Sequence, residues 1–109
     1  MIYLTASTVI RVATERADFR KGIDGFVALC QHDLRQNPRS GTLYVFLNRT
    51  ATMVRILAYD QHGPGYWLMT KRLSKGRYRG WPGGSSPLSP MEAHRLRQLL
   101  SGEVDSRDD

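Results

Sequence analysis

The sequence predicts a single α+β domain: an antiparallel β-meander of three to five strands, packed by one long helix and followed by a C-terminal helix. Three patterns support this prediction. Runs of β-branched and aromatic residues lie close together in the middle of the chain, apolar residues with helical spacing precede them, and a second helical pattern follows them. We expect the domain to cover residues 1–102, and residues 103–109 to form an acidic, disordered tail.

The N-terminal part predicts one strand and one helix. Residues 9–13 are β-branched and partly alternating, which is typical of a short strand. Asp18 is a candidate N-cap for a helix over residues 20–36. Gly22 and Gly25 would each weaken that helix by about 1 kcal/mol relative to Ala, so we expect a close contact to require them. One apolar stripe follows the helical spacing: Ile23, Phe26, Val27, Cys30 and Leu34.

The middle of the chain predicts the meander. Residues 43–47, 53–59 and 66–73 are rich in strand-forming side chains. Short polar turns join these runs, which favours antiparallel neighbours. Residues 77–82 are a candidate fourth strand at the edge of the sheet, and residues 83–87 form a flexible joint.

A capping pattern predicts where the C-terminal helix begins. Ser89 is a candidate N-cap, Pro90 suits the first helical position, and Glu92 suits the third. The helix is expected to end near Gly102. Its apolar side contains Ala93, Leu96, Leu99 and Leu100.

Positive charge is concentrated in one part of the chain. The 109 residues contain 16 Lys and Arg against 10 Asp and Glu, a formal net charge of +6. Between Leu34 and Pro82 lie nine cations and a single carboxylate, Asp60. This pattern favours an anionic partner, above all nucleic acid, and a basic surface that is merely solvated is the alternative. With one cysteine, Cys30, no long apolar run and no secretion signal, we expect a cytoplasmic protein.

Seven of these cations are candidate phosphate contacts. The alternating spacing of the basic residues from Lys71 to Arg79 suits a phosphate backbone, although an acidic protein would fit equally. Aromatic side chains in the same segment could stack on single-stranded bases. Phe46 and Trp67 are instead expected in the core. The candidate nucleic-acid contacts are Arg49, Arg55, Lys71, Arg72, Lys75, Arg77 and Arg79.

Metal and enzyme chemistry have little support in the sequence. The soft ligands lack a metal-binding spacing, so we expect no metal and no cofactor; they are Cys30, His32, His62 and His94. Asp60 and His62 could serve a small metal-dependent nuclease, since catalytic acids often follow strands. No nucleophile motif accompanies them, so we expect no catalytic residues and no enzyme activity.

Several blocks of the sequence resemble one family. They are Asp18–Phe26 (DFRKGIDGF), Pro38–Arg49 (PRSGTLYVFLNR) and Lys71–Pro82 (KRLSKGRYRGWP), followed by a final helix over residues 88–102. In this order and spacing they resemble the TnpB accessory proteins of bacterial insertion sequences of the IS-sixty-six type, which share only a name with the RNA-guided nuclease. The resemblance covers nearly the whole chain from about Val9.

The resemblance implies a non-catalytic accessory protein of DNA transposition, encoded beside a separate, larger transposase. The implied partners are nucleic acid, DNA rather than RNA, together with the transposase and other accessory proteins of the element, and no membrane. A protein-interaction module that docks on the transposase is the alternative to nucleic-acid binding. The motif residues that are candidates for this contact are Asp18, Arg20, Lys21, Gly22, Asp24, Gly25 and Trp81.

Overall fold

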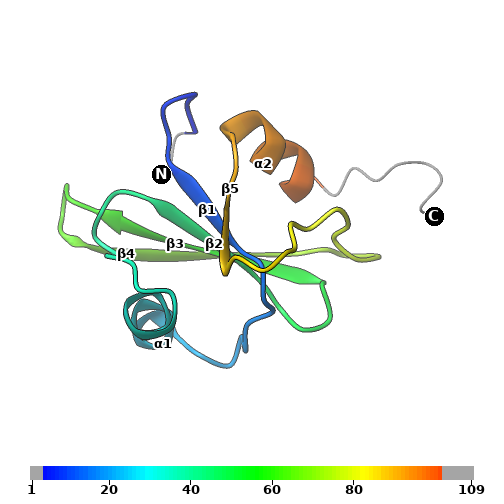
Figure 1. Cartoon of the computed structure of the whole chain (residues 1–109), viewed down its shortest axis with the longest axis horizontal. Helices are drawn as coiled ribbons and strands as arrows, with labels where there is room; N and C mark the ends of the chain where they lie inside the picture. The colour runs from blue at the N-terminus through cyan, green and yellow to red at the C-terminus, as the bar shows by residue number, and fades with distance from the viewer. Residues whose placement is uncertain (1–3, 102–109) are drawn as a thin grey trace.

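The structure, a computed structural model, describes residues 4–101, so the expected tail over residues 103–109 lies outside the described residues. It contains one mixed five-stranded sheet with a helix on either face (Figure 1). The strand order is β4-β3-β2-β1-β5. Neither helix of the described part is long and apolar enough to cross a lipid bilayer. In chain order the elements are β1 (Ile10–Ala13), α1 (Ile23–Ala28), the π-helical turn η1 (Leu29–Asp33), β2 (Leu43–Leu47), β3 (Met53–Asp60), β4 (Gly65–Arg72), β5 (Leu88–Pro90) and α2 (Ala93–Leu100).

The sheet combines antiparallel and parallel pairs. β2, β3 and β4 pair antiparallel in chain order, and they coincide with the three predicted strand runs to within one residue. β1 pairs parallel with β2, with Ile10 opposite Leu43, because the chain crosses through α1 between these two strands. β5 then pairs antiparallel with β1. The α+β class is therefore confirmed, whereas the purely antiparallel sheet is wrong.

The predicted edge strand over residues 77–82 is also wrong. This segment forms no strand in the structure, and its aromatic side chains contact the protein. Tyr78 is buried, and the Trp81 indole N–H donates to the Ala13 carbonyl at 2.9 Å. β5 occupies the edge beside β1 instead.

α1 begins later than predicted. Its N-cap is Gly22, in an extended conformation with φ −92° and ψ −162°, and no side chain caps the helix. Asp18 is therefore not the N-cap. Its carboxylate accepts the N–H of Arg20 at 3.0 Å, which holds residues 18–20 in a turn outside the helix.

The helix also ends earlier than predicted. The last turn is π-helical, and the Leu34 N–H donates to the Leu29 carbonyl at 3.0 Å. Arg35 follows with φ 55°, in the left-handed region, so a right-handed helix cannot continue to Gln36. One long helix is replaced by α1 and the turn η1.

α2 begins three residues later than the capping pattern predicts. Ser89 and Pro90 belong to β5, and the helix N-cap is Glu92, which makes no side-chain capping bond. Pairing with β1 extends past Pro90, because the Met91 N–H donates to the Ile10 carbonyl at 3.2 Å. A proline is tolerated there because β5 is an edge strand.

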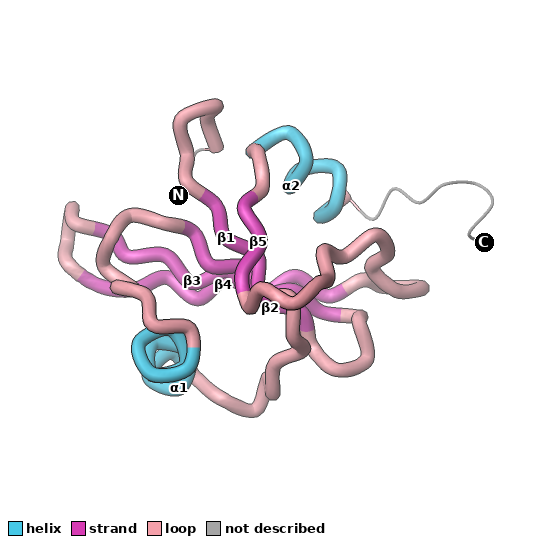
Figure 2. Tube along the Cα trace, in the orientation of Figure 1, coloured by secondary structure: helices cyan, strands magenta, loops and turns pink. Residues whose placement is uncertain are grey.

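The sheet separates two core layers, as Figure 2 shows from the positions of the helices. On one face α2 packs through Ala93, Leu96 and Leu99, which confirms the predicted apolar side of this helix. On the other face, α1 and η1 bury Phe26 and Cys30. The partners of α2 include Ile10, Val12, Val45 and Tyr78, and those of α1 and η1 include Tyr44, Phe46 and Leu57.

Only one of the two aromatic residues expected in the core is there. Phe46 is fully buried against the Phe26 ring, with the ring centroids 4.9 Å apart. Trp67 is 47% exposed on β4, so the expectation for this residue is wrong. α2 covers the sheet around β1 and leaves this part of β4 open.

Burial makes Cys30 chemically inert. Desolvation raises the pKa of its thiol from the ordinary 9.0 to about 12. We expect the folded protein not to react with an aromatic disulfide reagent at about pH 8, and to react promptly once denaturant exposes the thiol. Because the folded-state pKa is raised, the contribution of Cys30 to stability is complete below pH 9.0 and is lost as the pH rises towards about 12. Rapid labelling without denaturant would contradict this burial.

Candidate nucleic-acid interface

One end of the sheet brings together segments that are distant in the sequence. β3 begins at Met53, opposite Arg72, the last residue of β4, and β2 ends at Leu47 on the same side. The turn after β2 and the segment after β4 therefore leave the sheet at the same end. We call residues 48–52 and 72–79 the hairpin end.

Backbone hydrogen bonds hold the two segments of the hairpin end together. The Leu73 N–H donates to the Thr52 carbonyl at 3.0 Å, and the Tyr78 N–H donates to the Ala51 carbonyl at 2.7 Å. Asn48 fixes the turn because its Oδ1 accepts the Thr52 N–H at 2.9 Å. The Tyr78 ring is buried beneath the loop, with 4% exposed. The cations carried by these two segments are therefore held next to one another.

Five of the seven candidate contacts lie in the hairpin end with unused donors. All five side chains are exposed, and within residues 4–101 none of them makes a hydrogen bond or an ion pair. Their N–H groups are open to an anionic ligand, and arginine suits phosphate because it can donate two parallel hydrogen bonds. These five cations are Arg49, Arg72, Lys75, Arg77 and Arg79.

The sixth candidate, Lys71, makes a hydrogen bond with the C-terminal end of α2. Its Nζ donates to the Leu100 carbonyl in the last turn of α2. A cation at this position complements the negative end of the helix dipole. Lys71 therefore fastens α2 to β4, next to the hairpin end.

The seventh candidate, Arg55, is used inside the protein. Its Nη1 donates to the carbonyls of Phe19 and Lys21, at 2.7 and 2.8 Å, and its Nε donates to the Thr70 hydroxyl at 2.9 Å. The guanidinium carbon lies 4.8 Å from the Phe19 ring centroid and 5.7 Å from that of Phe26. Arg55 therefore joins the loop before α1 to the sheet, with few donors left for a ligand.

The loop before α1, residues 18–22, is also closed by an ion pair. The Arg20 guanidinium donates to the Asp18 carboxylate, with the closest contact at 2.7 Å. Hydrogen bonds from the side chain and backbone of Arg20 hold the pKa of Asp18 far below its usual range, and the same contact raises the pKa of Arg20. We call residues 18–22 the motif loop, since they form the first part of the block Asp18–Phe26.

The two glycines of this block have different surroundings. A Cβ on Gly22 would meet nothing within 4 Å, so the expected close contact is absent there. A Cβ on Gly25 would lie 2.8 Å from the Cβ of Lys21 and 3.2 Å from its Cγ. The close contact at Gly25 is therefore with the aliphatic part of Lys21. Asp24 is exposed in the first turn of α1, where the helix dipole favours a negative charge.

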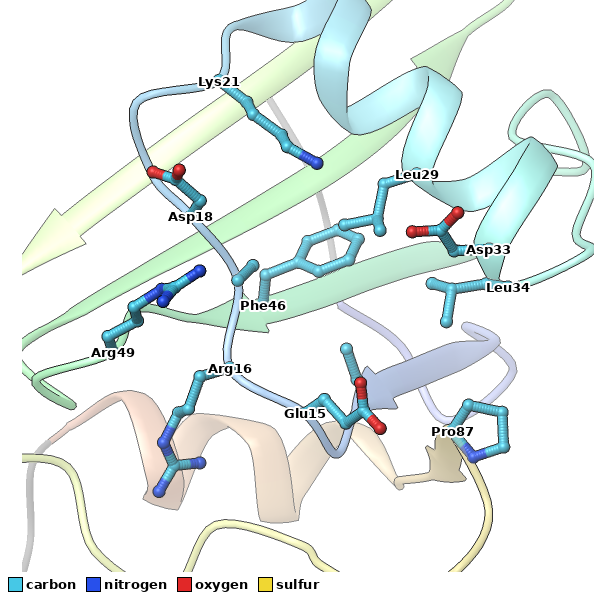
Figure 3. A pocket seen from close by; sticks show the side chains of 12 residues that line it. Glu15, Arg16, Asp18, Lys21, Leu29, Asp33, Leu34, Phe46, Arg49 and Pro87 are labelled. Carbon is cyan, nitrogen blue, oxygen red and sulfur yellow. The ribbon is translucent and has the colours of Figure 1, made fainter.

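A pocket of about 440 Å³ opens between the motif loop, η1 and the segment after β1 (Figure 3). Its floor contains Leu29 and Phe46, and Lys21 points over it from the motif loop. Arg49 belongs both to this pocket and to the hairpin end. The remaining charged residues at its rim are Glu15, Arg16, Asp18 and Asp33.

The sequence did not indicate this pocket. Arg16 and Asp33 come from a connection and from the π-helical turn, and no motif marks either of them. The unusual glycine at position 25 was the available signal, because it reveals that a neighbour must approach the helix closely there. The neighbour, Lys21, could not be inferred without the loop conformation.

Asp60, the residue of the nuclease alternative, organises a turn. One carboxylate oxygen accepts the backbone N–H of His62 at 2.8 Å, and the other accepts the indole N–H of Trp67 at 3.1 Å. These bonds, the indole one first, lower the pKa of Asp60. Within residues 4–101, no three His, Cys, Asp or Glu side chains are grouped so that they could hold a metal ion.

Comparisons with known proteins agree on one family. The family described as IS66 Orf2 like protein matches residues 8–107. Two proteins of Sinorhizobium fredii (strain NBRC 101917 / NGR234) are similar to this chain. "Uncharacterized protein y4hO" is 37% identical over 84% of this chain and 76% of its own length. "Uncharacterized protein y4jC" is 36% identical over 76% of this chain and 71% of its own length. No solved structure matches the chain significantly. The chain therefore belongs to the IS66 Orf2 like protein family of insertion sequences.

Proposed function

We propose that this protein is a non-catalytic accessory factor of transposition that binds DNA through phosphate contacts at the hairpin end. One observation supports the proposal above all. Five exposed cations from two adjoining segments make no hydrogen bond or ion pair through their side chains within residues 4–101, and only Arg49 is close enough to a carboxylate, that of Asp18, to lower its pKa. Such cations bind the regularly spaced phosphates of nucleic acid and release the counterions condensed on it.

The surroundings of these cations favour a duplex over a single strand. Single-strand binding normally uses free aromatic faces on which bases stack. Near the hairpin end, Tyr78 is buried, Phe19 lies against Arg55, and the Trp81 indole N–H is bonded within the protein. The exposed ring of Trp67 lies five residues from Arg72 along β4, which is about 16 Å. Contacts to the paired backbone therefore fit this surface best.

A salt titration tests this function. We expect a labelled duplex of about 24 base pairs to bind with an affinity that falls with salt, at a log–log slope of roughly −4.5 for five phosphate contacts. A single strand of the same length should bind more weakly, because its charge density is lower and, among residues 4–101, the exposed ring of Trp67 lies far from the hairpin end. Absent or salt-independent binding of both would refute DNA binding, and tighter binding of the single strand would refute the duplex preference.

A further inference from the structure

The motif loop fixes the position of one lysine from two sides. The Lys21 carbonyl accepts a hydrogen bond from Arg55 at 2.8 Å, which holds the backbone. The Lys21 stem lies across Gly25, where any larger residue would collide with it. Upstream, the ion pair of Asp18 and Arg20 shapes the loop. The block Asp18–Gly25 thus places the Lys21 ammonium group over the pocket, as Figure 3 shows.

The charges around this pocket are divided between its sides. Lys21, Arg49 and Arg16 stand along one side in Figure 3, and Asp33 and Glu15 stand along the other. Within residues 4–101 none of these five side chains makes a hydrogen bond or an ion pair. Asp18 also reaches the cationic side, but Arg20 already neutralises its carboxylate.

The space between the two charged sides is apolar and of ligand size. The partly exposed side chains of Leu29 and Leu34 contribute to it, and the fully buried ring of Phe46 lies beneath them. Its volume of about 440 Å³ lies within the range of ordinary ligand pockets. A group that fits must be apolar in the middle and negative towards Lys21.

We propose that this pocket is a docking site for a peptide segment of a partner protein, in which an acidic residue adjoins a large apolar residue. The carboxylate would lie against Lys21, and the apolar side chain would lie on Leu29 and Leu34, which are partly exposed. Asp33 and Glu15 argue against nucleic acid at this site, because a continuing chain of phosphates would meet two unpaired carboxylates. This surface is separate from the one proposed for DNA, apart from the shared Arg49.

The test is an NMR titration of the isotope-labelled full chain with blocked tetrapeptides. The probe has one aspartate followed by one leucine, flanked by glycines; one control replaces the aspartate with asparagine and another replaces the leucine with glycine. We expect the probe to bind in the millimolar range, with shifts centred on the amides of Lys21, Leu29 and Asp33. Each control peptide should bind at least about fivefold more weakly.

Matched lysine variants separate this site from the hairpin end. Lys21→Gln should weaken the probe about fivefold and leave duplex binding nearly unchanged, whereas Lys75→Gln should do the reverse. Asp33→Asn should strengthen the probe, because it removes a carboxylate from the rim. Equal effects of the two lysine variants, or no localised shifts up to about 20 mM peptide, would overturn the proposal. Duplex binding measured on the same samples tests separately whether the hairpin end binds DNA.

Discussion

Replacing the five cations of the hairpin end with glutamine should lower the affinity for a DNA duplex by about 1,000-fold near 0.1 M salt. The loss corresponds to about 4 kcal/mol, since five phosphate contacts and their counterion release disappear together. The log–log salt slope should approach zero in the same variant. Fluorescence anisotropy across a range of salt concentrations measures both quantities. The substituted residues are Arg49, Arg72, Lys75, Arg77 and Arg79.

The chain offers a matched control at the opposite end of the sheet. Arg35 is exposed and follows η1, on the side where β2 begins. Arg35→Gln should change duplex affinity far less than Arg77→Gln, although each removes one exposed positive charge. Equal losses from the two single variants would mean that net charge, and not the gathering of cations at the hairpin end, governs binding. The stability of all variants should stay within about 0.5 kcal/mol of the parent, because these side chains are exposed and make no hydrogen bond or ion pair with the described part of the chain, residues 4–101.

Arg55→Met should destabilise the fold by about 3 kcal/mol while leaving duplex affinity within about twofold. The substitution removes three hydrogen bonds and leaves the carbonyls of Phe19 and Lys21 without their donor. It also removes the cation from the Phe19 ring. Urea denaturation measures the stability, and anisotropy at a temperature where the variant is folded measures the affinity.

Arg55→Lys separates the contribution that the planar shape of the guanidinium group makes to stability from the contribution of its positive charge. A lysine keeps the positive charge but cannot donate to two carbonyls and the Thr70 hydroxyl from one planar group. We expect it to recover less than half of the lost stability. Full recovery by lysine, or a large loss of duplex affinity in Arg55→Met, would show that Arg55 acts as a surface cation after all.

The strands could be predicted from the sequence because their signal is local. The alternating and β-branched residues of β2, β3 and β4 favour an extended conformation, whichever strand each of them pairs with. The positions of β1 and β5 depend on pairing between segments at opposite ends of the chain, which no local pattern encodes. Ser89, Pro90 and Glu92 satisfy a helix-capping rule, yet pairing with β1 prevails over it.

The candidate site could be predicted only as a set of charges. The sequence indicates which segment is basic, but it does not show which guanidinium groups the protein uses itself. Arg55 and Arg77 are the same residue type in the sequence, and only the packing of the motif loop shows that Arg55 uses its donors within the protein whereas those of Arg77 are open. Trp67 shows the same limit, because its exposure depends on how far α2 extends over the sheet.

The pairing of β5 with β1 has a consequence for biosynthesis. Arg11 lies opposite Pro90, so the second strand to flank β1 is synthesised only after β1, β2, β3 and β4. Until then β1 keeps an open edge, and α2 cannot yet cover the apolar face it protects. The complete sheet therefore forms only after Pro90 has been translated, and a chain cut short before Leu88 exposes an unpaired strand edge and an apolar face that favour aggregation.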